Sequence, residues 1–321
     1  RIHILYLNNF TLCLHIPGVI VKKSLIGCPR DCYDTCGLNV YVEAGRIIRV
    51  EADNNWYTKG IPCPRAVKDR ERVYSPRRIL YPFASTSEGD FRRIEWDQAL
   101  DLLVSKLQEV LETHGPGKIL FLEYAGNRGV ITKYASRRLW NYLGATQTDG
   151  SICDYNGAEA LKCIYGSTYG VFPGELDEFN MAIIWGFNPA VSAIHLWRRI
   201  LGIKEKGGLI VTIDVRYTET AKQSTEFIRV KPGSDGYLAL GIAKYLIDKE
   251  YVDTEFIEKY THGFDKLVKH LEKYELGVVE EATGVSKKII IDLAEKLVAS
   301  KPFTIFIGYG LQRQYGGGEA V

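Results

Sequence analysis

The chain has 321 residues, which is enough for about two domains with a sizeable buried core. Hydrophobic residues make up 46% of it and charged residues 25%, which is typical of a globular protein. The net charge of +2 excludes a protein that holds nucleic acid mainly by bulk positive charge. A single Met and six Gln, beside plentiful Lys and Glu, favour a heat-adapted source.

The first 20 residues are predicted to lie outside the fold. They mix apolar residues with Asn8, Asn9 and Pro17, and they lack a charged start, an apolar run and a small-residue cleavage site. We find no twin-Arg pair there and therefore expect a cytoplasmic protein. The sequence has no stretch of 18 apolar residues, which predicts that it does not span a membrane.

The first half of the chain is expected to contain a hairpin, a connecting arm and one strand between two helices. Residues 38–52 alternate apolar and polar on both sides of Ala44-Gly45, which predicts a β-hairpin. Residues 67–95 contain prolines and mixed charges and are expected to form an irregular arm. Next we predict a helix over 97–113, a buried strand over 118–123 and a helix over 129–142.

From residue 181 onward, predicted strands alternate with predicted helices. Strands are expected over 181–187, 209–214, 225–230 and 303–307, and helices over 192–206, 236–249 and 286–299. This alternation is typical of an α/β protein with a doubly wound, Rossmann-like parallel sheet. Such sheets bind ligands beyond the carboxyl ends of their strands, where this sequence has Gly186, Gly308 and Gly310.

Four cysteines lie close together near the start, with the spacing Cys28-x3-Cys32-x3-Cys36 followed by Cys63. A disulfide framework is typical of small secreted domains, and this chain is too long and too poor in Cys for one. Three thiolates from a tight loop and one from a distant loop can surround a [4Fe–4S] cluster, and the predicted hairpin would return the chain to close the site. Zinc sites more often use two CxxC pairs, so iron–sulfur is favoured over zinc and over unligated thiols.

Several motifs in one order resemble the molybdopterin oxidoreductases of the dimethyl-sulfoxide-reductase superfamily. GCPRDCYDTCG at 27–37, GIPCPRA at 60–66 and YSPRRILYPF at 74–83 resemble the amino-terminal iron–sulfur module of that family. The similarity continues through WGFNPAVSAIHLWRRI, TIDVRYTETA, KPGSDGYLAL and GYGLQRQYGGG. It implies a [4Fe–4S] cluster and molybdenum or tungsten held by bis(molybdopterin guanine dinucleotide). It also implies two-electron redox chemistry on a small molecule.

The resemblance assigns roles to single residues. It implies that Cys153 in GSICDYNGAEAL is the protein ligand of the metal, with Asp154 as the fallback; taken alone, a lone Cys is more often a structural thiol. Cys163 is interpreted as a core residue. Arg65 stands where the family has a Lys between the cluster and one pterin, so it is the candidate for coupling the two centres, with a planar head that is not equivalent to Lys.

The loops after the predicted strands are expected to hold the dinucleotide. Gly186 and Asn188 precede a helix whose amino terminus suits a pyrophosphate. Asp214 ends a strand, where an acidic residue commonly accepts hydrogen bonds from ribose hydroxyls. By resemblance Asp235 reads guanine, and the alternative is that it caps the helix over 236–249. The remaining predicted cofactor-binding residues are Arg216, Gly308, Gly310, Gln312 and Asn127.

The resemblance also divides the chain into parts. It implies a [4Fe–4S] domain over 21–75, the first half of an α/β domain over 76–145, a second α/β domain over 146–302, and the start of the returning half of the first over 303–321. Catalytic subunits of the family are longer, so we expect either a separate chain with the remaining half or a truncated product with little activity. The other expected partner is an iron–sulfur electron-transfer subunit, with no nucleic acid. Two alternatives stay open: a non-catalytic electron-transfer or scaffold subunit, and a zinc-bound nucleotide-binding protein.

Overall fold

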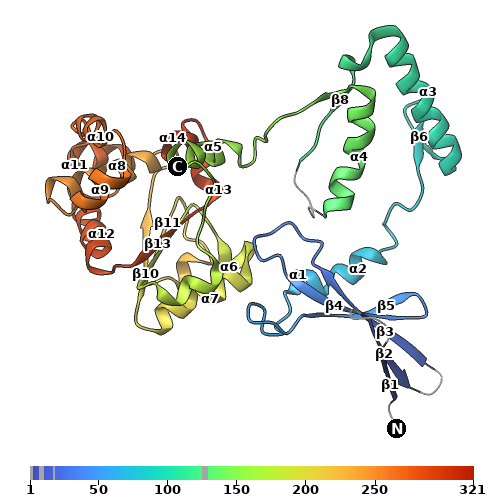
Figure 1. Cartoon of the computed structure of the whole chain (residues 1–321), viewed down its shortest axis with the longest axis horizontal. Coiled ribbons are helices and arrows are strands. Elements are labelled where there is room, and N and C mark those ends of the chain that lie inside the picture. The colour runs from blue at the N-terminus through green and yellow to red at the C-terminus, as the bar shows by residue number, and fades with distance from the viewer. Residues whose placement is uncertain (1–2, 7–10, 17–18, 125–128) are drawn as a thin grey trace. The chain divides into compact units, whose positions relative to one another are not determined.

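A computed structural model describes residues 3–6, 11–16, 19–124 and 129–321 of the chain. The chain divides into two compact units, an amino-terminal unit over Arg1–Asp149 and a carboxy-terminal unit over Gly150–Val321 (Figure 1). Among the helices in the described ranges, none combines the length and the apolar character that crossing a bilayer requires.

An antiparallel sheet of five strands forms the first part of the amino-terminal unit. In spatial order its strands are β1 (His3–Tyr6), β2 (Thr11–Ile16), β3 (Val19–Gly27), β4 (Gly37–Glu43) and β5 (Arg46–Ala52). The β4–β5 pair confirms the predicted hairpin, and its turn residues Ala44 and Gly45 have positive φ angles of 45° and 78°. We expected residues 1–20 to lie outside the fold, but the described residues 3–6 and 11–16 form β1 and β2, because β2 pairs with β3 and β1 pairs with β2.

The rest of the amino-terminal unit consists of short elements and two longer helices. The predicted irregular arm contains α2 (Asp69–Val73) and the hairpin of β6 (Phe83–Ser85) with β7 (Phe91–Arg93), after α1 (Pro64–Val67). The elements that follow are α3 (Trp96–His114), η1 (Pro116–Lys118), β8 (Leu120–Phe121), α4 (Val130–Leu143) and β9 (Thr146–Gln147). The strand predicted over 118–123 is shortened to β8, because Pro116 begins a 3-10 turn that takes up Lys118.

The carboxy-terminal unit alternates strands and helices as the sequence predicts. It contains α5 (Tyr155–Tyr165), η2 (Pro173–Glu178), β10 (Met181–Trp185), α6 (Pro189–Ser192), α7 (Ile194–Glu205), β11 (Leu209–Asp214), η3 (Ala221–Gln223), β12 (Glu226–Arg229) and α8 (Asp235–Asp248). Four helices, α9 (Thr254–Tyr260), α10 (Phe264–Leu271), α11 (Leu276–Thr283) and α12 (Lys287–Ala299), precede β13 (Phe303–Ile307), α13 (Tyr309–Gln312) and α14 (Gly317–Ala320). The helix predicted over 192–206 is separated from α6 by Ala193, whose φ of −149° is not helical.

The strands of this unit form one parallel sheet in the order β12-β11-β10-β13. Within this sheet, β10 comes first in the sequence. The next two strands, β11 and β12, lie on one side of β10, and the last strand, β13, pairs with its other side. The strand order therefore reverses between β10 and β13, which confirms a doubly wound sheet. Because β13 pairs with β10 from Met181↔Phe303 to Trp185↔Ile307, residues 303–307 belong to this sheet and not, as expected, to a first α/β domain.

Helices cover both faces of the parallel sheet (Figure 1). Met181, Ile183 and Trp185 of β10 pack into one hydrophobic core with side chains of α8, α11 and α12. Ala182 and Ile184, which point to the opposite face, pack into a second core with α7. All of β10 is buried, as expected for a parallel sheet that is covered on both faces.

Candidate functional site

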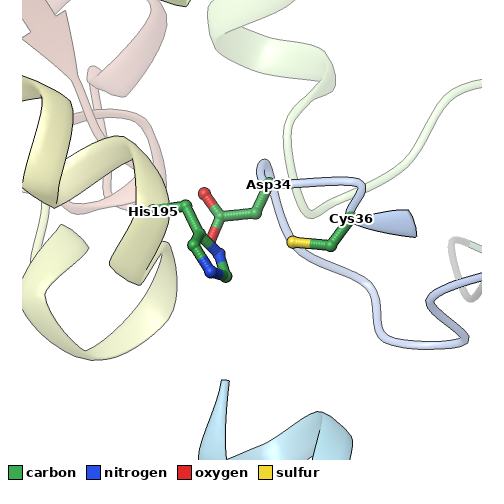
Figure 2. Close-up of side chains that lie close together, drawn as sticks. All are labelled: Asp34, Cys36 and His195. Atoms are coloured by element: carbon green, nitrogen blue, oxygen red, sulfur yellow. The ribbon is translucent and has the colours of Figure 1, made fainter. Parts of the chain in front are cut away.

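Three of the four clustered cysteines lie on the loop between β3 and β4. The strand pair Gly27↔Gly37 closes this loop, and within it the Cys28 N–H donates to the Cys36 carbonyl oxygen at 2.8 Å. Figure 2 shows Cys36 with Asp34 on the same loop. The backbone hydrogen bond at the base of the loop therefore holds its first and last cysteines together.

The side chain of Asp34 anchors this loop to the segment after β5. The Tyr57 hydroxyl donates to Asp34 Oδ1 at 2.8 Å. Burial, with the Asp34 carboxylate beside it, raises the pKa of Tyr57 far above its usual value, so the tyrosine remains a donor. Thr35, between Asp34 and Cys36, has a φ of 42°, which β-branched residues rarely adopt, so the surrounding contacts hold a strained turn here.

The fourth cysteine, Cys63, is the N-cap residue of α1, with Pro64 at the first helical position. The six cysteines whose side chains the structure describes are all free of disulfides. Burial raises the pKa of Cys28, and repulsion from Cys36, Cys32 and Cys63 raises it further. The other three sulfurs therefore lie near enough to Cys28 to influence its charge.

Backbone N–H groups point at the sulfurs of this thiol cluster. Cys28 accepts a hydrogen bond from the Arg30 N–H, and Cys32 accepts one from the Asp34 N–H. Burial opposes charge on Cys63, but the N–H groups of Ala66 and Arg65 and the Arg65 guanidinium outweigh it and lower the pKa of Cys63. Four free thiols, with N–H donors directed at three of them, fit a [4Fe–4S] cluster, whose sulfurs take part in such hydrogen bonds.

Arg65 brings a permanent positive charge to the thiol cluster. Its side chain donates to Cys63, and its charge also attracts Cys32. The Arg65 carbonyl oxygen accepts from Arg30 Nη2 at 3.4 Å, and the same Nη2 lies 2.9 Å from Asp69 Oδ1. This brace connects the cysteine loop with α1 and α2, so Arg65 is fixed at both its backbone and its head group.

Three predicted glycines meet where the strand order reverses in the parallel sheet. Gly186 follows β10 with a φ of 59°, and its carbonyl oxygen accepts from the Gly310 N–H at 3.1 Å. A Cβ on Gly308 would lie 2.1 Å from that carbonyl oxygen, and one on Gly310 would lie 2.8 Å from it. Close contact between the two loops therefore requires glycine at both positions, whatever ligand the edge binds.

The predicted polar residues at this edge all have protein partners. Asn188 Oδ1 accepts from Thr220 Oγ1 at 2.7 Å, and its amide donates to Glu219 Oε2 at 2.9 Å. Asp214 Oδ1 accepts from the Arg216 N–H at 3.1 Å. Burial, with a smaller repulsion from Asp235, raises the pKa of Asp214, so this carboxyl is easier to protonate than an exposed one.

Asp235 is buried at 5% exposure and uses both carboxylate oxygens within the protein. Trp185 Nε1 donates to Oδ1 at 2.8 Å, and Gln314 Nε2 donates to Oδ2 at 3.1 Å. Asp235 is the first residue of α8, and Ser234 is the N-cap residue, so the capping alternative for Asp235 is wrong. Its role in reading guanine stays a prediction.

Cys153 lies in the turn before α5 and contacts the segment after α13. Arg313 Nη2 lies 2.7 Å from Cys153 Sγ, and Arg313 Nε donates to the Cys153 carbonyl oxygen at 3.0 Å. Gln312 Oε1 accepts from the Gly157 N–H at 2.9 Å, so the side chain of Gln312 contacts α5, and its role in binding the cofactor stays a prediction. Cys163 is exposed, which corrects its interpretation as a core residue: Gly157 is the one buried residue of α5, all of which the structure describes.

Sequence reasoning missed Arg313, Trp185 and Gln314. The signal for Arg313 was its position in the glycine-rich segment GYGLQRQYGGG. The sequence alone could not show that this segment contacts the turn with Cys153. Trp185 was interpreted only as a strand residue, although a buried indole N–H needs an acceptor. The predicted residue Asn127 lies outside the described residues.

Comparison with known proteins identifies the family of this chain. Residues 78–321 match the family described as molybdopterin oxidoreductase. The chain belongs to this family. Membership implies a molybdopterin cofactor and confirms the resemblance seen in the motifs.

Relatives of this molybdopterin oxidoreductase chain are similar along most of its length. It is 34% identical to the probable oxidoreductase YyaE of Bacillus subtilis, over 94% of this chain and 45% of that protein. It is 28% identical to the dimethyl sulfoxide reductase DmsA of Escherichia coli, over 90% of this chain and 41% of that protein. The chain thus spans less than half the length of these relatives.

One solved structure shares the fold. The acetylene hydratase from Pelobacter acetylenicus matches with a TM-score of 0.78 at 22% identity. The match covers 92% of this chain and 41% of that one, so it extends through both units.

Proposed function

We propose that the thiol cluster of Cys28, Cys32, Cys36 and Cys63 holds a [4Fe–4S] cluster. The observation that carries this proposal is that Cys28 lies near enough to the other three thiols to feel their charge, together with the N–H groups directed at three of the four. Zinc would also take four thiolates, but the spacing lacks the paired CxxC units that structural zinc sites commonly use.

We propose further that Cys153 is a ligand of molybdenum or tungsten in a bis(molybdopterin guanine dinucleotide) cofactor. The Cys153 side chain is partly exposed and in no disulfide, and a thiolate is a soft ligand that suits such a metal. When bound, the cofactor supplies two-electron redox chemistry on a small-molecule substrate.

In this proposal the protein orients and tunes the two centres. Arg65 keeps a positive charge beside Cys63, which stabilises the more negative, reduced state of a cluster and suits a residue that couples the cluster to a pterin. The Gly186 and Gly308–Gly310 loops lie at the reversal of strand order, where doubly wound sheets bind nucleotides. Asn188 and Asp214 lie in neighbouring loops and serve as candidate contacts for phosphate and ribose.

For guanine recognition, Asp235 would act as a carboxylate already oriented by the protein. Trp185 and Gln314 each donate a hydrogen bond to one carboxylate oxygen of Asp235. Each oxygen has a second lone pair that could accept a hydrogen bond from guanine. The partner that suits the proposed function is an electron-transfer protein with its own iron–sulfur cluster.

Metal analysis of the protein purified without oxygen tests the cluster assignment. We expect roughly four irons with acid-labile sulfide per chain and an electron paramagnetic resonance signal on reduction. Cys63→Ser should lower the iron content and change this signal, because the N-cap sulfur closes the site. Cys163→Ser is the matched control, since it changes an exposed cysteine outside the thiol cluster.

Zinc without iron would contradict the proposal, even after anaerobic reconstitution. Equal iron content in Cys63→Ser and Cys163→Ser would contradict the assignment of Cys63.

A further inference from the structure

Arg313 contacts Cys153 through two donors at once, one to the sulfur and one to the backbone. The guanidinium presents two donors on one edge: Nη2 lies 2.7 Å from the sulfur, and Nε lies 3.0 Å from the carbonyl oxygen of the same residue. This fork fixes the direction of the Cβ–Sγ bond relative to the backbone. The two residues are 160 positions apart in the sequence, so the fold brings them together.

The guanidinium itself is held in place. Arg313 Cζ lies 4.2 Å from the centre of the Tyr309 ring, which sets the plane of the head group. The Arg313 N–H donates to the Tyr309 carbonyl oxygen at 3.0 Å, which fixes the backbone from which the side chain starts. Arg313 therefore approaches the sulfur from a restrained direction.

The start of α5, directly after the turn that carries Cys153, is already fastened to the Gln312 segment without Arg313. Gln312 accepts the Gly157 N–H at 2.9 Å through its side chain and the Asn156 amide at 3.3 Å through its carbonyl oxygen. Among the residues that the structure describes, no carboxylate lies within ion-pair distance of Arg313. The charge of Arg313 is consequently directed at the sulfur and is not neutralised by an acid.

We propose that Arg313 is a positioning residue that orients the Cys153 sulfur and sets the reduction potential of the metal that this sulfur binds. The inference rests on the proposed role of Cys153 as ligand. A fixed positive charge beside the ligand sulfur stabilises the more electron-rich, reduced state of the centre. Without that charge the centre is harder to reduce.

A redox titration of the metal-loaded protein, followed by the electron paramagnetic resonance signal of the molybdenum or tungsten, tests this proposal. Arg313→Gln should shift the midpoint potential to a lower value. Arg313→Lys, which keeps the charge but not the fork, should stay closer to the wild type. Arg198→Gln is the matched control, because it removes an exposed arginine of α7 in the same unit.

Equal potentials for Arg313→Gln and Arg198→Gln would overturn the proposal. If Arg313→Gln does not load metal, Arg313→Lys decides: loading with a potential near the wild type supports a role for the charge. Failure of both variants to load would mean that Arg313 only holds the turn, and would overturn the proposal.

Cys153→Ala separates this inference from the function on which it rests. An unchanged metal signal in Cys153→Ala would refute Cys153 as ligand. A changed signal in Cys153→Ala, with no shift in Arg313→Gln, would refute the role of Arg313 alone.

Discussion

The parallel sheet and the helices α3 and α4 both contain many apolar residues, but these residues are buried in the sheet and exposed on the helices. Every residue of β10 is buried, and helices pack on both faces of its sheet. In α3 the leucines repeat at helical spacing, but none of its 19 residues, all of which the structure describes, is buried. On α4, Ile131 is 83% exposed.

This difference shows what an apolar pattern can and cannot establish. Periodicity predicts that a segment is a helix with an apolar face, and α3 forms within a residue of its predicted limits. Burial needs a second surface, and the sheet has one on each face: α8, α11 and α12 pack on one face and α7 packs on the other. Substitutions should therefore cost much more in the sheet than in the helices.

The largest effect is expected for a core isoleucine. Ile210→Ala on β11 removes a side chain with 0% exposure and should lower the free energy of unfolding by about 2–5 kcal/mol. Ile131→Ala on α4 makes the same chemical change at an exposed site and should alter it by about 0.5 kcal/mol or less. Urea unfolding of the full chain, followed by tryptophan fluorescence, measures both. Similar losses for the two variants would mean that the α4 face is covered in solution.

A smaller loss is expected where two loops of the sheet touch. Gly308→Ala places a Cβ 2.1 Å from the Gly186 carbonyl oxygen, and moving the loops apart should cost about 1–3 kcal/mol. Gly117→Ala in η1 is the control, since no described atom lies within 4 Å of its built Cβ. The thermal midpoint should fall only for Gly308→Ala. Tolerance of both changes would show that the Gly186 contact is not needed for the fold.

The smallest effect is expected at Asp214 and depends on pH. Burial raises the folded-state pKa of Asp214 above its usual 3.8, so the ionised carboxylate opposes folding at neutral pH. Asp214→Asn keeps an oxygen for the Arg216 N–H and should raise the free energy of unfolding at pH 7 by less than about 1 kcal/mol, because solvent screens this half-buried group.

The advantage of Asp214→Asn should shrink as the pH falls through the raised pKa, because the wild-type carboxyl then takes up its proton in the folded state. Unfolding at pH 7 and near pH 4 measures the change, with Asp101→Asn on exposed α3 as the control for loss of one charge. A stability gain that does not depend on pH would rule out desolvation of Asp214 as its cause.

Much of the fold could be predicted because its signals are local. The hairpin turn at Ala44-Gly45 and the strand over 303–307 follow from a few neighbouring residues. The predictions that differ from the structure depend on partners elsewhere in the chain. Residues 3–6 and 11–16 form strands because β3 offers them an edge, and residues 303–307 join the second sheet because β10 was free on one side.

The sequence by itself determined the family, the four clustered thiols and the order of strands and helices, because motif spacing and periodicity are written along the chain. Only the tertiary structure decided what each predicted site residue contacts. It directs Gln312 to the Gly157 N–H, pairs Asp235 with Trp185 and Gln314, and brings Arg313 to Cys153. Such contacts join positions 50 to 160 residues apart, and no local pattern specifies them, because they depend on how the loops meet at one edge of the sheet.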